Sequence, residues 1–67
     1  MRVAVALEPE SAEADRILAE WRLAWGAAES DDGVELAVAE SLAALLDLKA
    51  RCFDHGLTVN ATFPDNQ

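Results

Sequence analysis

Cys52 and His55 carry the side chains of this sequence that are best suited to metal binding or to nucleophilic catalysis. They stand three positions apart, so on one helix both can reach a single metal ion, with Asp54 nearby. A structural zinc site needs four ligands, however, and the sequence has no second Cys/His pair. A cysteine nucleophile needs a well-placed base and an oxyanion hole, and nothing in the sequence marks either. We therefore interpret Cys52 as a packed residue and His55 as a helix-terminal one. We predict a protein that is not an enzyme and holds no metal or cofactor.

Acidic residues crowd the segment between two expected helices, namely Glu29, Asp31, Asp32 and Glu35. Closely spaced carboxylates can bind calcium, but this segment lacks the Asp-x-Asp-x-Asp-Gly spacing that places oxygens around the ion. Helix capping and solubility explain these residues better. The segment is nevertheless a dense acidic turn, and we take its four acids as candidate partner-binding residues.

Trp21, Trp25 and Lys49 are the other candidates for contact with a partner. The two tryptophans are spaced four residues apart on the apolar side of an expected helix, which favours the core, but two indoles are large for a chain of 67 residues. If the core cannot enclose both, one becomes an anchor in an exposed apolar patch. Lys49 falls within the apolar arc of the next helix. Either its stem packs while its ammonium reaches solvent past the sheet edge, or it meets an acid of a second subunit or partner.

The length of 67 residues predicts a single small domain, near the lower limit at which one core suffices without a partner. One cysteine cannot form an internal disulfide, so a reduced, cytoplasmic setting is expected. The apolar run at residues 3–7 is too brief for a signal-peptide core or a membrane span. Residues 64–67 are expected to form a mobile tail.

The formal net charge is −8, from thirteen acids and five bases, and ten of the acids fall between Glu8 and Glu40. This balance disfavours direct binding to nucleic acid or to an anionic membrane. A partner protein with a basic surface is the more natural match.

The first half of the chain is predicted to contain a strand and a helix. Residues 2–7 are predicted to form a strand, with Val3, Val5 and Leu7 on one face and the small Ala4 and Ala6 on the other. Both faces are apolar, so both can be covered. Pro9 breaks the strand and suits the first turn of a helix, and Gly26 ends or frays that helix. Residues 26–33 then form a short connection. The apolar stripe of this helix consists of Ala14, Ile17, Leu18, Trp21, Ala24 and Trp25.

One long amphipathic helix is predicted to begin after Asp32, with Asp32 and Glu35 arranged as a capping box. Its outward side carries Asp47 and Arg51 as an ion pair, and Gly56 can take the left-handed conformation that ends a helix. Its apolar, core-facing stripe consists of Val34, Val38, Leu42, Leu45, Leu46, Cys52 and Phe53.

Residues 57–63 alternate between apolar and polar side chains and predict a final, half-buried strand. The fold class is therefore α+β in the order β-α-α-β, with a helical hairpin packed on a small antiparallel sheet. Two strands alone are marginal and leave both edges open, so we expect a homodimer or another partner to extend the sheet.

The sequence leads to three hypotheses about function. The first is a small acidic, non-enzymatic module that docks on a basic protein surface as an inhibitor or regulator, acting as a nucleic-acid mimic where that surface normally binds nucleic acid. The second is an accessory or structural subunit that joins a larger assembly through an apolar face containing the tryptophans. The third is an enzyme that uses Cys52, His55 and the acids, and it has the least support.

Overall fold

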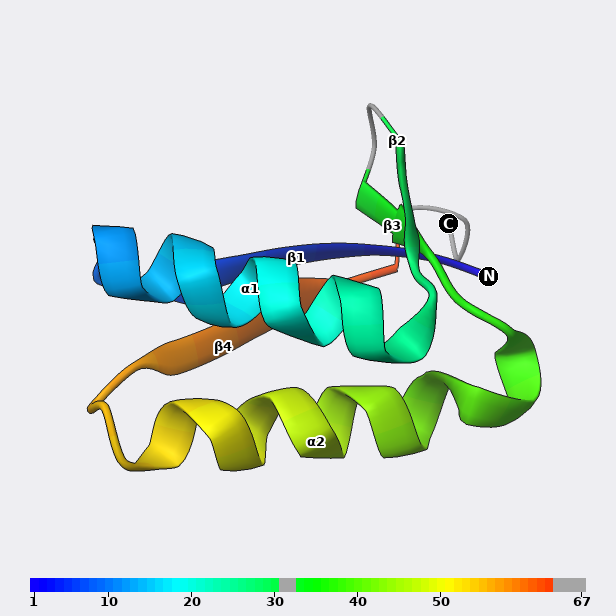
Figure 1. Cartoon of the computed structure of the whole chain (residues 1–67). Helices are drawn as coiled ribbons and strands as arrows, with labels where there is room; N and C mark the ends of the chain where they lie inside the picture. Colours follow the sequence, from blue (N-terminus) through cyan, green and yellow to red (C-terminus); the bar gives the residue numbers. More distant parts are fainter. Residues whose placement is uncertain (31–32, 64–67) are drawn as a thin grey trace.

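The structure of the protein is a computed structural model that describes residues 1–30 and 33–63; the predicted tail of residues 64–67 lies outside this range. Seven elements follow one another along the chain (Figure 1). They are β1 (Arg2–Glu8), α1 (Ala12–Trp25), β2 (Ala28–Ser30), β3 (Gly33–Glu35), the 3-10 turn η1 (Val38–Glu40), α2 (Ser41–Phe53) and β4 (Thr58–Thr62).

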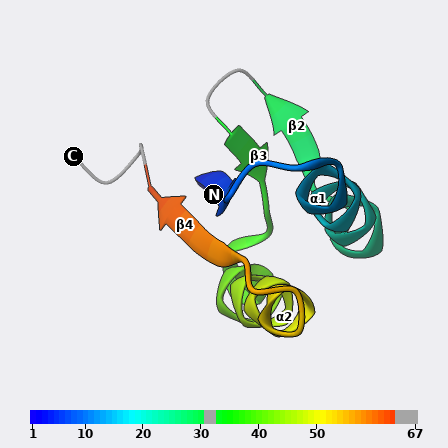
Figure 2. The same ribbon diagram turned by 90° about the vertical axis from the view of Figure 1, so that its left-hand side faces the viewer.

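The four strands form one antiparallel sheet in the order β2-β3-β1-β4, and both helices cover the same face of it (Figure 2). The predicted α+β class is confirmed, and so is the antiparallel pairing of the first and last strands. The two helices run antiparallel, as expected for a hairpin, although a pair of strands joins them instead of a short loop. The order β-α-β-β-α-β with this strand arrangement is the split, ferredoxin-like topology.

The prediction for residues 26–40 was wrong, because this part of the chain contains two strands and no α-helix. Ala28–Ser30 and Gly33–Glu35 pair with each other, and Val34 pairs with Val3 of β1. Glu35 therefore belongs to a strand and cannot complete a helix-capping box, and Asp32 lies outside the described residues. Val34 fits a helical stripe by spacing, but its burial at 5% exposure comes from strand pairing, a tertiary contact that local propensity does not reveal. The chain itself thus supplies the strands that extend the β1–β4 pair.

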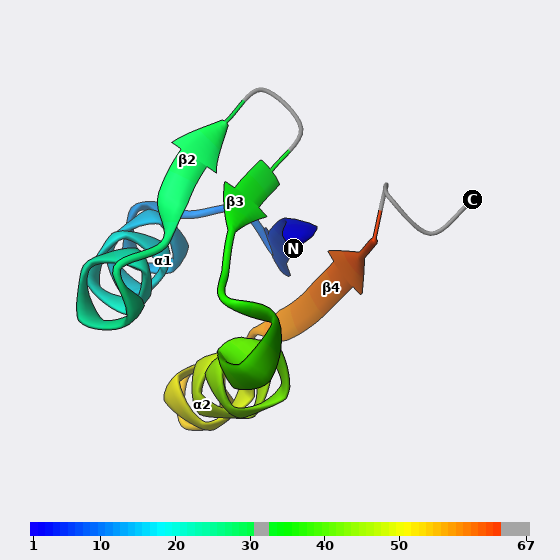
Figure 3. The same cartoon turned by 90° about the vertical axis from the view of Figure 1, so that its right-hand side faces the viewer.

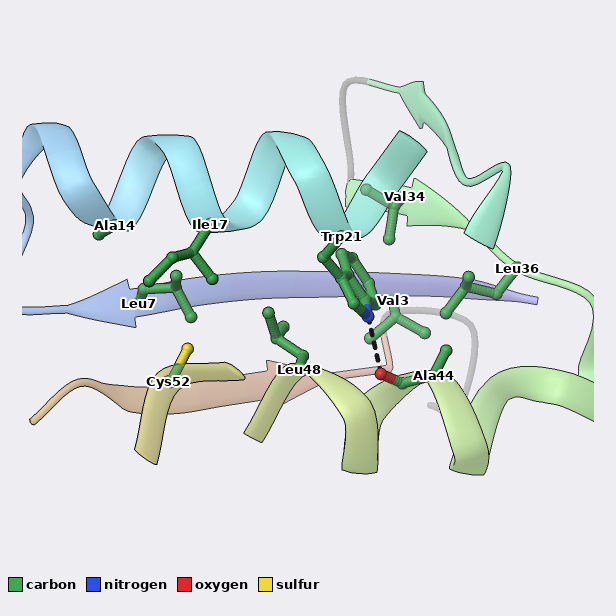
Figure 4. Packing of buried hydrophobic residues seen from close by; sticks show 10 residues of the cluster. All are labelled: Val3, Leu7, Ala14, Ile17, Trp21, Val34, Leu36, Ala44, Leu48 and Cys52. Carbon is green, nitrogen blue, oxygen red and sulfur yellow. Dashed lines mark hydrogen bonds between the residues drawn. The ribbon is translucent and has the colours of Figure 1, made fainter. Parts of the chain in front are cut away.

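The core lies between the helices and the sheet, and it is centred on Trp21, which is fully buried (Figure 4). Its indole Nε1 donates a hydrogen bond of 2.7 Å to the carbonyl oxygen of Ala44 on α2. The bulk of this ring fills the space between the helices, so the facing position on α2 must be small. The ten buried residues are Val3, Leu7, Ala14, Ile17, Trp21, Val34, Leu36, Ala44, Leu48 and Cys52.

Helix α2 presents a different side to the core from the one predicted. Its buried residues are Ala44, Leu48 and Cys52. Of the predicted stripe on this helix only Cys52 is buried and Leu45 is half-buried. The stripe was misassigned because the large side chains were taken as the core, whereas the Trp21 ring requires Ala44 there. The large predicted core residues that lie exposed are Val38, Leu42, Leu46 and Phe53.

The ends of the helices follow local chemistry. The Ser11 hydroxyl accepts a 3.0 Å hydrogen bond from the Ala14 amide and caps the start of α1. Gly26, with φ 62°, ends α1, so this predicted glycine stop is confirmed. Helix α2 ends at Phe53 with Asp54 as its C-cap, earlier than the predicted stop at Gly56, although Gly56 has the expected left-handed conformation with φ 65°. Within the described residues, neither helix combines the length and the apolar character that crossing a bilayer requires.

Candidate protein-binding surfaces

Cys52 lies on the core side of α2, where its side chain is completely buried. Burial disfavours the charged thiolate and raises the pKa of the Cys52 thiol. A neutral thiol without access to solvent is neither a nucleophile nor an available metal ligand. The structure therefore gives Cys52 a packing role.

His55 follows the end of α2 on the surface, away from the Cys52 thiol in the core. Its Nδ1 lies 2.6 Å from Oε1 of Glu13, near the start of α1, so the pair joins the two helices at one end of the molecule. Within the described parts of the chain, no three His, Cys, Asp or Glu side chains are grouped so that they can hold a metal ion.

The two tryptophans, proposed as surface anchors if the core could not hold them, both contact α2. Trp21 is inside the core, which removes it from the candidate surface. Trp25 is half-buried, and its Nε1 donates a 2.8 Å hydrogen bond to Oδ2 of Asp47. Arg51 donates to the same oxygen at 2.8 Å, which confirms the predicted Asp47–Arg51 pair. The hydrogen bond from Trp25 and then that from Arg51 hold the pKa of Asp47 below its usual value.

Of the four acids of the predicted turn, the structure describes Glu29 and Glu35, and these two lie apart. Glu29 lies on β2 opposite Val34, and Glu35 lies on β3 opposite Ala28, so the two side chains extend from opposite faces of the hairpin. Glu29 Oε2 is 4.0 Å from Nη2 of Arg22, and both acids are exposed. Asp31 and Asp32 are outside the described residues.

No charged residue in the described ranges is buried. Exposed acids lie along α1, just before it, and on β2. Among them Glu13 lies on the side of α1 that faces His55, and Glu29 lies on the edge strand of the sheet. We call this set the acidic surface, and it consists of Glu10, Glu13, Asp15, Glu20 and Glu29.

Helix α2 and strand β4 lie next to each other at the other edge of the sheet (Figure 3). A groove of about 360 Å³ between them adjoins a hollow of about 300 Å³, and Lys49 and Val59 line both. We call the two together the apolar surface. Its residues are Leu42, Leu45, Leu46, Lys49, Phe53, Leu57, Val59 and Ala61.

Lys49 is the single charged residue of the apolar surface. It is exposed, and it makes no ion pair with any residue in the described part of the chain. Sequence reasoning singled out Lys49 for its place in an apolar arc but assigned that arc to the core. The neighbouring Leu42, Leu46 and Phe53 were predicted to be core residues and not surface residues. The sequence does contain a signal for their role, because a helix with apolar residues on most of its sides is expected to be covered on more than one side.

No protein-family model, curated protein or solved structure matches this chain. Its topology hosts many unrelated activities, so the fold carries no functional conclusion. Function must instead be argued from the acidic and apolar surfaces.

Proposed function

We propose that this chain is a small acidic protein-binding module, not an enzyme, that docks on a basic protein surface as an inhibitor or regulator. The observation that carries the proposal is that no charged residue in the described ranges is buried, in a chain with a formal net charge of −8. Such a field attracts basic partners and repels nucleic acid and anionic membranes. We further propose a reduced, cytoplasmic setting, because the one cysteine has no partner for an internal disulfide.

The residues on the sheet face away from the helices support a protein that mimics nucleic acid better than one that binds nucleic acid directly. Sheets that bind single-stranded RNA use exposed aromatic rings on which bases stack. By the strand register, the described open face is made of small and polar side chains, with acids near both of its ends. They are Arg2, Ala4, Ala6, Glu8, Ala28, Glu35, Thr58, Asn60 and Thr62.

The proposal is tested by capturing host proteins on the immobilised chain and identifying them by mass spectrometry. A triple variant, Glu29→Gln, Asp31→Asn and Asp32→Asn, which we call the hairpin variant, neutralises the three acids of residues 29–32. A matched control, Glu40→Gln, Asp54→Asn and Asp65→Asn, makes the same change in net charge at residues that do not belong to the acidic surface. We expect basic proteins to be captured, to elute between about 0.05 and 0.5 M salt, and to be lost more completely with the hairpin variant than with the control.

A duplex DNA oligonucleotide added as competitor shows whether the chain binds a nucleic-acid-binding surface of its partner or another basic surface. Release of the captured protein by DNA indicates that the chain occupies a nucleic-acid-binding surface. Binding that is insensitive to salt over the stated range, or unchanged in both charge variants, contradicts docking by charge.

The alternative function, an accessory subunit of a larger assembly, is favoured by the apolar surface and no longer by the tryptophans. Leu46 and Phe53 are well exposed, whereas Trp21 is in the core. A Trp21→Ala change therefore mainly tests folding. Replacing Leu46 or Phe53 by a polar residue is the appropriate test of assembly through an apolar face.

A further inference from the structure

The large side chains on α2 are exposed in a continuous row. Leu42, Leu46 and Phe53 have exposed fractions of 70%, 57% and 83%, while the opposite side of the helix contributes Ala44, Leu48 and Cys52 to the core. Single exposed leucines are common, but a row of this kind beside a groove marks an interaction site. Helix α2 thus has two apolar sides, and the described chain covers one of them.

Strand β4, next to this row, is an edge strand without the usual protection against further pairing. Natural edge strands are guarded by charges, proline or short length. The five residues of β4, Thr58–Thr62, include no charged residue and no proline. The other edge strand, β2, is three residues long and carries Glu29. Pairing with another strand is therefore much more favourable at β4.

We propose that the apolar surface is the two-fold interface of a homodimer, in which β4 pairs antiparallel with β4 of a second copy and the two α2 helices pack side by side. This inference is independent of the proposed charge-based docking. The dimer would have one continuous sheet of eight strands, with four helices on the same face.

A second copy fits because α2 and β4 can each pair with the same element of a copy that is turned by 180°. When α2 packs antiparallel on its copy, Leu42 meets Phe53 and Leu46 meets Lys49, so each apolar residue has a partner and the Lys49 stem covers Leu46. When β4 pairs with its copy about Asn60, the apolar Val59 lies opposite Ala61 on the helix side.

A single two-fold axis can relate both the two β4 strands and the two α2 helices. Lys49 and Val59 line both hollows of the apolar surface, so the middle of α2 lies beside the middle of β4. An axis through Asn60 then passes near the centre of the exposed row, between Leu46 and Lys49. A different partner protein has no reason to share this symmetry, whereas an isologous dimer requires it.

The area and the charge of the apolar surface agree with a second copy of the chain as its partner. A standard interface of about 800 Å² per partner is just under a fifth of the 4441 Å² surface, roughly one side of a body with extents of 29 × 20 × 16 Å. The residues of the acidic surface belong to α1, the segment before it and β2, and none belongs to α2 or β4, the two elements of the proposed interface. No acid lines the apolar surface, and Lys49 makes it unfavourable for a basic partner.

The mass of the full chain in solution, measured by light scattering or sedimentation, tests the proposal. We expect twice the monomer mass of 7.2 kDa at roughly 0.1 mM protein, with dissociation on dilution. Leu46→Glu places a charge at the centre of the interface in both copies and should raise the dissociation constant roughly 100-fold or more. Leu23→Glu, at a residue of α1 that is 85% exposed, is the matched control and should leave the dimer intact.

An engineered disulfide tests the geometry directly. In the proposed register the two copies of residue 60 face each other, so Asn60→Cys should cross-link the dimer on oxidation, whereas Ala28→Cys on the other edge strand should not. Circular dichroism of each variant checks that the chain remains folded. The proposal is overturned by a monomer at all concentrations, by a dimer that survives Leu46→Glu, or by cross-linking at position 28 but not at position 60. A monomer that uses this surface only to bind a different protein overturns it as well.

Discussion

Asp47 links the two helices through hydrogen bonds to a single carboxylate oxygen. Its Oδ2 accepts hydrogen bonds from Trp25 of α1 and from Arg51 of α2, each of 2.8 Å. The carboxylate therefore fastens the two helices together beside the core, while the Trp21–Ala44 bond does so within it. The i,i+4 pair with Arg51 could be predicted from spacing. The bond to Trp25 could not, because 22 residues separate the two and sequence does not show which acid a tryptophan will meet.

The lowered pKa of Asp47 predicts that part of the stability is lost in acid. A carboxyl group with a folded pKa below its unfolded value stabilises the folded chain above about pH 4. That contribution is lost as the pH falls below 4 and through the folded pKa. Asp47→Asn should lower the free energy of unfolding by about 1 kcal/mol at pH 7, a modest value because the side chain is 34% exposed. The difference from wild type should shrink toward pH 3.

Urea unfolding followed at several pH values measures this effect. Glu20→Gln is a suitable control, because it removes an exposed carboxylate of α1 that has no ion pair with any described residue. A constant difference between wild type and Asp47→Asn from pH 7 to pH 3 would show that the charge of Asp47 does not act as described.

At the scale of elements, the features predicted correctly are those determined by local chemistry. The first and last strands, the first helix, its stop at Gly26 and the left-handed conformation of Gly56 follow from alternation, periodicity and turn residues. The hairpin of β2 and β3 was missed because each strand has only three residues, too few for a periodic signal. The side of α2 that faces the core was missed because it depends on the shape of Trp21. The candidate apolar surface could not be located until that side was known.

Gly33, the first residue of β3, lies close against the backbone of β1. Its φ is 137°, and a side chain at this position would collide with the carbonyl oxygen of Val3. Gly33→Ala should therefore force the two strands apart and lower the free energy of unfolding by about 2 to 4 kcal/mol. Thermal or urea unfolding measures the loss.

Gly56→Ala provides the comparison for this prediction. Gly56 also has a positive φ, of 65°, but no atom lies within 4 Å of the position that a side chain would occupy. Only the left-handed conformation is then penalised, at about 1 to 2 kcal/mol. Equal losses for the two variants would mean that the close approach of β3 to β1 contributes nothing.

At the scale of the whole molecule, the acidic surface and the apolar surface lie at different edges of the sheet. The acidic surface occupies α1 and the β2 edge, and the apolar surface occupies α2 and the β4 edge. A net charge of −8 on a chain with extents of 29 × 20 × 16 Å produces self-repulsion that is stronger in the compact state than in the unfolded one. Salt screens this repulsion.

Salt should consequently stabilise the fold. Raising sodium chloride from about 0.05 to 0.5 M should increase the free energy of unfolding by roughly 1 kcal/mol, as measured by thermal unfolding at constant protein concentration. The Glu29→Gln, Asp31→Asn and Asp32→Asn variant has a net charge of −5 instead of −8 and should respond less. A fold that salt weakens would indicate that attractive ion pairs outweigh the repulsion.

The strand order β2-β3-β1-β4 places the acidic hairpin and the uncharged edge strand at opposite ends of the sheet. Docking through one end leaves the other end accessible. In the proposed dimer the two hairpins would stand at the far ends of one continuous sheet. Such a particle is bivalent, so two basic sites on an oligomeric target or on neighbouring molecules can be held at once. Its avidity would then exceed the affinity of a single hairpin without any additional contact.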